Sequence, residues 1–483
     1  MQNSKLVLRL LVLLAFVMAL TACGSDDAAT AGPADDVATT TDGSALLGAD
    51  AVGGDAADDA APSDDAAAED AATDAQSDVA YSDAPFETAS HYTLPQLVYG
   101  GVDVLHHPHI VTVTFAGEQN ADQFEQFAAQ LQTTKWWDAW SVGYCSSTGK
   151  CIGKGDTDKV RLGASAAKSY TDSTAPGGAS TIQQFLKSHI DSAELPAPVT
   201  DTLYVVYFPQ GTKIALASGG GQPASNSCQA WGGYHHSMAY GSGKIAYAII
   251  PECKWGDPGM TQVENSLFTA SHEISEAATD PFSTATTTGS PYGGFNINVM
   301  DENVLAWVFA LGGGEVADLC PSQYVGYAEE NGYKLARVWS NIAVKANHNP
   351  CVPADPGPYF NAAPEKNKGT HVKLELGASA TIALHAFSDV AVKAWTLTAV
   401  DLGTLMGAGS NPALTFDFDG QSSVSVNNGD VINVTITRNY NAQGVMAIGN
   451  VGAIGVIVST SSDGQTSFYW PIWSYTAAEI AGG

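Results

Sequence analysis

The stretch SHEISEAATDP, residues 271–281, places His272 and Glu276 four positions apart, with a second carboxylate, Glu273, directly after the histidine. On a helix, side chains at i and i+4 lie on one face, so this pair could hold one divalent metal ion. The pattern is the H-E-x-x-H arrangement of zinc peptidases with its second histidine changed to glutamate. In that arrangement Glu273 would be the general base, and we call these three side chains the helix trio.

The residues around the helix trio predict one amphipathic helix. Asp257-Pro258 suits an N-cap and a first helical position, and Asp280-Pro281 should end the helix, because proline disfavours the α conformation in the residue before it. Between these limits, apolar residues recur at spacings of three and four: Met260, Val263, Leu267, Ala270, Ile274 and Ala277. The helix trio falls outside this stripe. It therefore either faces a cleft or forms an ordinary charge pair on a solvated helix face.

Residues 1–23 are expected to be a bacterial lipoprotein signal peptide. Lys5 and Arg9 precede a short apolar run that ends in the lipobox LTAC, residues 20–23. The run is shorter than the ~20 residues that span a bilayer, so cleavage and acylation of Cys23 are expected. The expected location is the bacterial cell envelope, with a lipid anchor in the membrane. The outer membrane or cell surface is favoured because the residue directly after the cysteine is Gly24 and not Asp. An uncleaved anchor would leave the same topology.

Residues 24–90 predict a disordered acidic tether. This stretch is rich in Ala and Asp and contains neither Lys nor Arg. Such a segment buries too little apolar surface to offset the entropy of ordering it. Much of the formal net charge of -30 lies here. An acidic chain argues against nucleic acid as a partner. Cation binding by the Asp-rich run is the alternative to a simple tether.

The cysteines predict a disulfide-bonded protein. Of the seven, Cys23 is the expected lipidation site, and six remain in an oxidising compartment. Chain proximity favours the pairs Cys145–Cys151, Cys228–Cys253 and Cys320–Cys351, although other pairings are open. A Cys-rich metal site is disfavoured because no C-x-x-C pair occurs.

The rest of the chain predicts two domains, residues 91–352 and 359–483, joined by the stiff linker PADPGP, residues 353–358. The first domain mixes strands and helices and is expected to be a zincin-like α+β domain. Its expected strands are 109–115, 202–208 and 244–250, and its expected helices are 121–137 and 180–192.

The second domain alternates strands and turns, which is typical of an all-β antiparallel sandwich. Its expected strands include 372–376, 381–387, 393–400 and 431–437. Asn428-Gly429 predicts a hairpin between residues 424–426 and the strand from Val431. Trp470, Trp473 and Tyr475 could form an aromatic binding platform, but packing in the core is the preferred interpretation.

Several motifs of the first domain recur, in the same order, in one known family. These motifs are NADQFEQFAAQLQTTKWWDAW, GGYHHSMAYGSGKIAYAIIPEC, SHEISEAATDP, GGEVADLC and KLARVWSNIAVKANHNPC. The domain resembles the Exordium or phosphate-induced proteins of plants and their bacterial relatives. Two departures affect the substrate side: Gly232 stands where the family has a cysteine, with Cys228 nearby, and a longer Thr-rich insertion begins at Phe282.

The resemblance implies that the helix trio forms a site, and it nominates Asp318 in EVADLC as a third metal ligand. Cys320 would hold that segment through its disulfide. His235 matches a histidine of the family and is an additional candidate, and Asp280, at the helix end, is a weaker one. The family supplies no reaction that can be carried over.

A metal held by His272, Glu276 and Asp318 would be a divalent cation, with zinc as the expected ion. The two carboxylates would neutralise it, so it would acidify water less than the ions of His-richer hydrolases. One expected function is a surface-anchored, metal-dependent hydrolase, a zinc peptidase acting on an extracellular protein or cell-wall substrate with Glu273 as general base. The alternative is a non-catalytic cell-surface lipoprotein with a structural metal site, which binds a partner or glycan.

Overall fold

The computed structural model describes residues 86–173, 178–217, 224–254, 259–282, 293–298, 301–311, 313–320, 327–365, 370–405, 411–439 and 452–482. The predicted signal peptide with Cys23 and nearly all of the predicted tether lie outside these ranges. Asp257-Pro258 and most of the Thr-rich insertion also lie outside them. No helix in the described ranges is long and apolar enough to cross a membrane.

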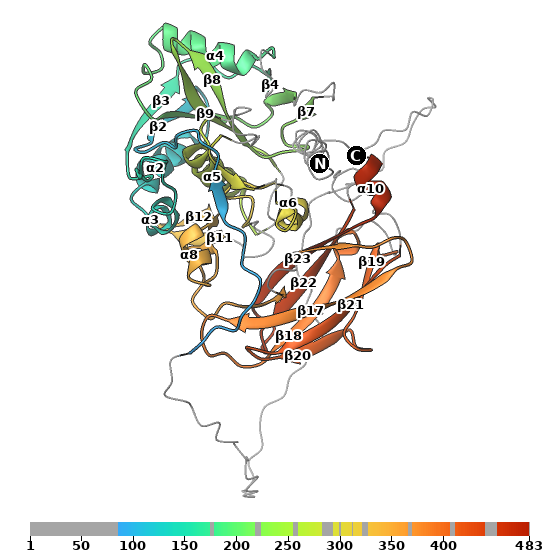
Figure 1. Ribbon diagram of the computed structural model, residues 1–483. Helices are drawn as coiled ribbons and strands as arrows, with labels where there is room; N and C mark the ends of the chain where they lie inside the picture. Colours follow the sequence, from blue (N-terminus) through green and yellow to red (C-terminus); the bar gives the residue numbers. More distant parts are fainter. Residues whose placement is uncertain are drawn as a thin grey trace, which may run out of the picture.

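A five-stranded sheet forms the centre of the first region. Its strands are β2 (His109–Phe115), β3 (Asp156–Leu162), β5 (Thr202–Phe208), β8 (Tyr234–Tyr240) and β9 (Gly243–Pro251). They lie in the order β3-β2-β5-β9-β8, and four of them run parallel. β8 is the last strand at one edge and runs antiparallel to β9 (Figure 1).

The central strands are apolar on both sides because both faces of the sheet are covered. Alternate residues of β5 and β9 point into two separate clusters of buried side chains. One face packs on α2 (Ala121–Leu131), α3 (Lys135–Ser141) and α5 (Gln262–Thr279), and the other on α4 (Thr181–Asp191). Continuous apolar strands are typical of a parallel sheet enclosed in this way.

The helix expected over residues 121–137 is in fact two helices, so that prediction was wrong. The chain leaves the helical path after Leu131, and Thr134 caps the next helix by accepting a hydrogen bond from the Trp137 backbone N–H. A threonine cap of this kind satisfies a backbone donor that a new helix would otherwise leave unpaired. The break turns the tryptophans of α3 fully into the core.

The helix that carries the trio begins later than the sequence suggested. Thr261 is its N-cap and forms a capping box with Glu264, so Met260 precedes the helix. Capping boxes satisfy two backbone donors at once, which explains why the helix begins here. The helix ends with Asp280 as its C-cap, as the Asp280-Pro281 pair predicted.

Smaller elements connect these layers. The short sheets pair β1 with β10, β11 with β12 and β13 with β14, and β6 pairs with both β4 and β7. The bounds are β1 Leu97–Tyr99, β4 Ser169–Ser173, β6 Lys213–Ala217, β7 Ser225–Asn226, β10 Phe295–Ile297, β11 Tyr327–Glu330, β12 Tyr333–Ala336, β13 Val338–Trp339, β14 Cys351–Val352, α6 Leu305–Leu311, α8 Asn341–Lys345, α9 Leu402–Leu405 and α10 Ala477–Gly482.

The C-terminal region is a β-sandwich, as expected. One sheet has the order β15-β17-β21-β19 and the other β16-β23-β22-β18-β20. The bounds are β15 Phe360–Pro364, β16 His371–Lys373, β17 Ser379–Ser388, β18 Trp395–Asp401, β19 Leu414–Asp417, β20 Ser423–Val426, β21 Val431–Arg438, β22 Ala453–Thr460 and β23 Ser467–Tyr475. The pairs are antiparallel except that β16 runs parallel to β23.

The hairpin predicted at Asn428-Gly429 is wrong, although the turn itself exists. Gly429 has a positive φ of 96°, and the Asp430 N–H donates to the Asn427 carbonyl. However, β20 pairs with β18 and β21 pairs with β17 and β19, so the turn carries the chain from one sheet to the other. Turn chemistry is local, whereas the choice of partner strand is decided by packing over the whole sandwich.

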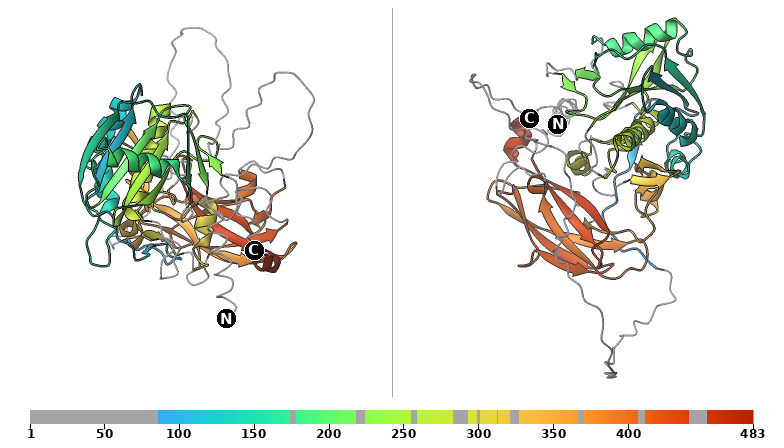
Figure 2. Two further views of the ribbon diagram at one scale, coloured as in Figure 1. Left: turned by 90° about the horizontal axis from the view of Figure 1, so that it is seen from above. Right: turned by 180° about the vertical axis from the view of Figure 1, so that it is seen from behind.

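The two regions share one continuous apolar core. The ring of Trp307 on α6 lies 5.4 Å from that of Trp470 on β23, and Phe309 lies 5.1 Å from Trp473. Trp470 and Trp473 are buried, so they belong to the core, as preferred, and do not form an exposed platform. Figure 2 shows the sandwich, in orange to red, directly beside the first region in both views.

The first described residues lie along the sandwich before the chain enters the first region. The Asn428 side chain accepts a hydrogen bond from the Ala89 N–H and donates one to the Glu87 carbonyl. The His91 ring stacks on Phe387 at 3.5 Å, and the Tyr92 N–H donates to the Pro364 carbonyl. We call residues 87–92 the N-terminal strap.

Candidate metal centre

The C-terminal half of α5 presents a row of ionisable side chains on one face. His272, Glu276 and Asp280 follow one another at intervals of four residues. The His272 Nε2 atom lies 3.2 Å from Glu276 Oε2 and 3.7 Å from Asp318 Oδ1. Ligand atoms of His272, Glu276 and Asp318 all lie within 4.8 Å of one another, close enough to hold one metal ion. The three predicted ligands therefore converge.

Glu276 is held so that its two oxygens have different surroundings. Its Oε1 atom accepts hydrogen bonds from the backbone N–H groups of Ala317, at 3.3 Å, and Asp318, at 3.2 Å. This leaves Oε2 facing the imidazoles of His272 and His235. Because the backbone contacts fix the carboxylate plane, Oε2 is already oriented as a ligand.

His235 reaches the same cluster from the edge strand β8. Its Nδ1 atom lies 3.3 Å from Glu273 Oε2 and 3.7 Å from Glu276 Oε2. Its Nε2 atom lies 3.6 Å from Glu315 Oε1. His235, Glu276 and Glu315 form a second set whose ligand atoms lie within 4.8 Å of one another.

Glu315 is the residue that the sequence did not identify. It lies three positions before Asp318 in EVAD, within one acidic motif, and that spacing was the available signal. Asp280, by contrast, belongs to neither set of three. Its Oδ1 atom accepts a hydrogen bond of 2.8 Å from the Gly294 N–H, so it also supports the backbone around the site.

The segment that carries Glu315 and Asp318, residues 313–320, has no helix or strand and is fixed by its neighbours. Its carbonyl at Gly314 accepts from the Ile297 N–H, and its carbonyl at Val316 accepts from the Trp339 N–H, each at 2.8 Å. The disulfide Cys320–Cys351 holds its far end. An irregular segment needs such restraints if its side chains are to stay at ligand distance.

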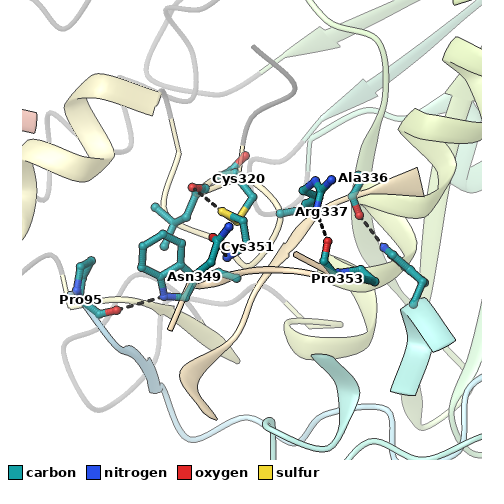
Figure 3. The surroundings of a disulfide bond; sticks show 12 residues. Pro95, Cys320, Ala336, Arg337, Asn349, Cys351 and Pro353 are labelled. Carbon is teal, nitrogen blue, oxygen red and sulfur yellow. Dashed lines mark hydrogen bonds between the residues drawn. A yellow bond between two sulfur atoms is a disulfide. The ribbon is translucent and has the colours of Figure 1, made fainter. Parts of the chain in front are cut away.

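Figure 3 shows the surroundings of that disulfide, whose Cys351 lies opposite Trp339 in the pair of strands β13 and β14. The indole N–H of Trp339 donates to the Pro95 carbonyl beside it at 3.0 Å, and Arg337 donates to the carbonyl of Pro353 in the expected linker. The other disulfides are Cys145–Cys151 and Cys228–Cys253. All three pairs are those that chain proximity favoured.

Two glycines leave room for the carboxylates of the centre. A Cβ atom at Gly313 would lie 1.9 Å from Asp318 Oδ2. A Cβ atom at Gly233, just before β8, would lie 3.2 Å from Glu273 Oε1 and 2.5 Å from the methyl group of Thr269. Neither glycine has a positive φ, so the requirement is space and not backbone conformation.

The centre is strongly acidic and opens to solvent on one side. Five carboxylates surround two imidazoles: Glu273, Glu276, Asp280, Glu315 and Asp318 around His235 and His272. Among the described residues, the ion pairs of these carboxylates are made with histidine and not with Lys or Arg. The side chains of His272 and Asp318 are each 25% exposed, whereas that of Glu276 is 3% exposed.

The pKa shifts follow from burial and from this charge imbalance. Burial lowers the pKa of His272, but the carboxylates of Glu276, Glu273 and Asp318 outweigh it and raise the pKa to about 10. Burial and the charge of Glu276 raise the pKa of Asp318 to about 7. Burial also raises the pKa of Glu315 well above its usual range.

These shifts indicate that the centre retains protons in order to limit its negative charge. A divalent cation would replace such protons, and imidazole nitrogen with carboxylate oxygen is a donor set that binds zinc and similar ions. The buried Oδ2 atom of Asp280 has no hydrogen-bond partner in the described part of the chain, which also fits an uncompensated acidic centre. The residues present therefore fit a divalent cation.

Comparison with known proteins adds little to this geometry. No protein-family model matches the chain, and no curated protein matches it. Solved structures with partial similarity include domain 1 of VCBP3 from Branchiostoma floridae, at 7% identity and a TM-score of 0.17, covering 26% of this chain and 98% of that one. A mutant of the SrpA adhesin from Streptococcus sanguinis has 12% identity and a TM-score of 0.17, covering 26% and 62%. A chimeric titin with a decorin peptide has 14% identity and a TM-score of 0.14, covering 25% and 94%.

Proposed function

We propose that this protein is a metal-dependent peptidase in which His272, Glu276 and Asp318 hold a catalytic divalent cation, with zinc as the expected ion. The observation that carries the proposal is the convergence of these three side chains from α5 and the segment 313–320. A cation held there would polarise a substrate carbonyl as a Lewis acid. The quarter-exposed His272 and Asp318 give substrate access to that side.

Glu273 is assigned the role of general base. It follows His272 directly on α5, and its charge is close enough to raise the pKa of that histidine. A carboxylate in this position can accept a proton from the attacking water and later return it to the leaving amine. The imidazole of His235 lies beside it, with Nδ1 3.3 Å from Glu273 Oε2.

The edge strand β8 favours a peptide as substrate over other hydrolysable groups. β8 is the last strand of its sheet and carries His235, which contacts the helix trio. An extended peptide can pair with such an edge through main-chain hydrogen bonds, so its backbone would pass beside the centre. This arrangement of edge strand and metal helix supports the zincin-like assignment of the first domain.

The proposal extends to the place of the protein in the cell. The LTAC lipobox supports a lipid anchor in the bacterial envelope, and the acidic tether would separate the folded regions from the membrane. The ordered motifs of the first domain support membership of the Exordium-like proteins. An extracellular protein or cell-wall peptide is then the substrate class within reach.

The test combines metal content with cleavage of an unfolded protein. Purified protein should contain stoichiometric zinc and should cleave the substrate. Glu273→Gln should keep its zinc and lose about 100-fold or more in cleavage rate, because only the proton acceptor is removed. Glu329→Gln, at an exposed position on β11, is the matched control and should behave as the unsubstituted protein.

Two results would contradict the peptidase. One is a protein without stoichiometric metal, and the other is full cleavage by Glu273→Gln. Tight zinc binding without cleavage of any tested protein would favour the non-catalytic alternative, in which the ion is structural and the sandwich binds a partner or glycan.

A further inference from the structure

A second set of ligand atoms lies directly beside the proposed catalytic ion. It consists of His235, Glu276 and Glu315, and it shares Glu276 with the first set. Each set offers one imidazole nitrogen and two carboxylate oxygens. Neither set contains both imidazoles, so among the described residues the ligand atoms form two adjoining groups and not one larger group.

We propose that His235, Glu276 and Glu315 bind a second divalent cation, with Glu276 bridging the two ions. This inference rests on the proposed function for the first ion, which His272, Glu276 and Asp318 would hold. Paired metal ions in hydrolytic enzymes lie about 3.5–4 Å apart, and a shared carboxylate is compatible with such a separation. We call the two positions the outer ion, beside His272, and the inner ion, beside His235.

The geometry of Glu276 supports a bridging role. Its Oε2 atom lies 3.2 Å from an imidazole nitrogen of His272 and 3.7 Å from one of His235, so it lies between the two groups. Its Oε1 atom is already occupied by the N–H groups of Ala317 and Asp318. The single free oxygen is therefore the one that faces both positions.

Two buried polar side chains near the inner position have unused atoms. Asp280 is 1% exposed and its Oδ2 atom has no hydrogen-bond partner among the described residues. Asn296 is 2% exposed, and neither atom of its amide has a partner in that part of the chain. A buried polar atom without a partner costs about 1–3 kcal/mol, and a bound cation beside these oxygens would offset part of that cost.

Both unused side chains face the segment that carries Glu315. The Oδ1 atom of Asn296 would lie 2.5 Å from a Cβ atom placed at Gly314, the residue before Glu315. Asp280 lies one helical turn beyond Glu276 on the same face of α5, and its charge acts on both Glu315 and His235. Asp280 and Asn296 therefore border the segment of the inner position without belonging to its set of three ligands.

Burial distinguishes the two positions. The inner set has side chains 7%, 3% and 15% exposed for His235, Glu276 and Glu315, while His272 and Asp318 of the outer set are each 25% exposed. The outer ion would therefore meet substrate, and the inner ion would compensate the charge of the buried carboxylates. An oxygen-rich position of this kind accepts Mn²⁺ as well as Zn²⁺.

The experiment counts ions in the full-length protein and in two matched variants. The metal-depleted protein is loaded with Mn²⁺ or Zn²⁺, dialysed, and measured by elemental analysis. The unsubstituted protein should hold about two equivalents, and Glu315→Gln and Asp318→Asn should each hold about one. The Mn²⁺ protein should show the EPR spectrum of a coupled pair, and each variant should show that of an isolated ion. Glu329→Gln should behave as the unsubstituted protein.

The results separate this inference from the proposed function. One equivalent that is lost in Asp318→Asn but kept in Glu315→Gln would overturn the inner ion and leave the peptidase intact. One equivalent that is lost in Glu315→Gln but kept in Asp318→Asn would support the inner ion and overturn the outer ion. No bound metal would overturn both. Far-UV circular dichroism of each variant, matched to that of the unsubstituted protein, shows that the variant is folded.

Discussion

In the proposed site, the surroundings of Glu276 suit a glutamate in place of the second histidine of the zinc-peptidase pattern. A histidine has one ring nitrogen for the metal and one N–H that needs an acceptor. Glu276 instead accepts two backbone N–H groups on one oxygen and presents the other to the imidazoles. Glutamate at position 276 therefore connects α5 to the segment 313–320, and it also makes the centre more negative.

At Gly313 the space left for a carboxylate can be tested directly. In Gly313→Ala the new methyl group would occupy the position of Asp318 Oδ2, so Asp318 should move away from His272. We expect zinc affinity to fall by about 10- to 100-fold, the range seen when support of a ligand is lost. Competition with a chromophoric chelator would measure it.

Gly243→Ala is the matched control for this substitution. A Cβ atom at Gly243 would meet nothing within 4 Å, and the residue lies at the start of β9. Equal zinc affinities for the two variants would show that Asp318 is not held by the space at Gly313.

At the level of elements, the bounds of a strand or helix were predicted correctly where the residues that set them are neighbours in the sequence. The strands 109–115 and 202–208 have the predicted bounds because proline, which cannot donate to a strand ladder, stands directly before the first and directly after the second. The end of α5 was predicted by Asp280-Pro281. The split between α2 and α3 was missed because the Thr134 cap lies inside a stretch that still looks helical.

The candidate site was predicted only in part, because some of its residues are close in the sequence and others are far apart. The helix trio is a local pattern, and Asp318 was reached only through a resemblance between ordered motifs. Glu315 was missed because His235, its neighbour in space, lies on an edge strand that is far from it in the sequence, and no spacing rule connects the two. The pairing of β20 with β18 was likewise beyond local patterns, since it depends on how two sheets pack.

The junction of β9, α2 and α5 gives a prediction on pH. Glu252 follows β9 and accepts a hydrogen bond from Asn120, the N-cap of α2, and burial with the nearby Glu118 carboxyl raises its pKa to about 8. Since this pKa is raised on folding, the stabilisation from protonated Glu252 is complete below pH ~4.5 and is lost as pH rises through about 8.

We therefore expect Glu252→Gln to be more stable than the unsubstituted protein at pH 9, with little difference at pH 5. Urea unfolding at both values would measure this, with exposed Glu329→Gln as control. A stability difference that does not change with pH would show that Glu252 ionises normally in the folded protein.

At the scale of the molecule, the sandwich and the first region are parts of one core. Trp307 is 6% exposed and packs between Trp339 and Trp470, one from each region. Arg337 of the first region donates a hydrogen bond to the carbonyl of Pro353 in the linker. A shared apolar core of this kind couples the unfolding of the parts that contribute to it.

We expect one cooperative thermal transition in the described regions and a change in Trp307→Ala. The substitution should cost about 3 kcal/mol or more and should separate the transition into two. Differential scanning calorimetry would show this. The control Phe185→Ala, on the opposite face of the sheet, should lower stability without separating the transition. Two transitions in the unsubstituted protein would show that the regions unfold independently.

The N-terminal strap determines where tension on the N-terminal chain is borne. A pull transmitted through residue 86 first loads the contacts of Glu87 and Ala89 with Asn428 on the sandwich. Only after these contacts broke would force reach β1, whose partner β10 includes Ile297, the donor to the Gly314 carbonyl beside the candidate metal centre. The contacts of the strap with the sandwich would therefore have to break before a force applied at residue 86 reached the geometry around Glu276.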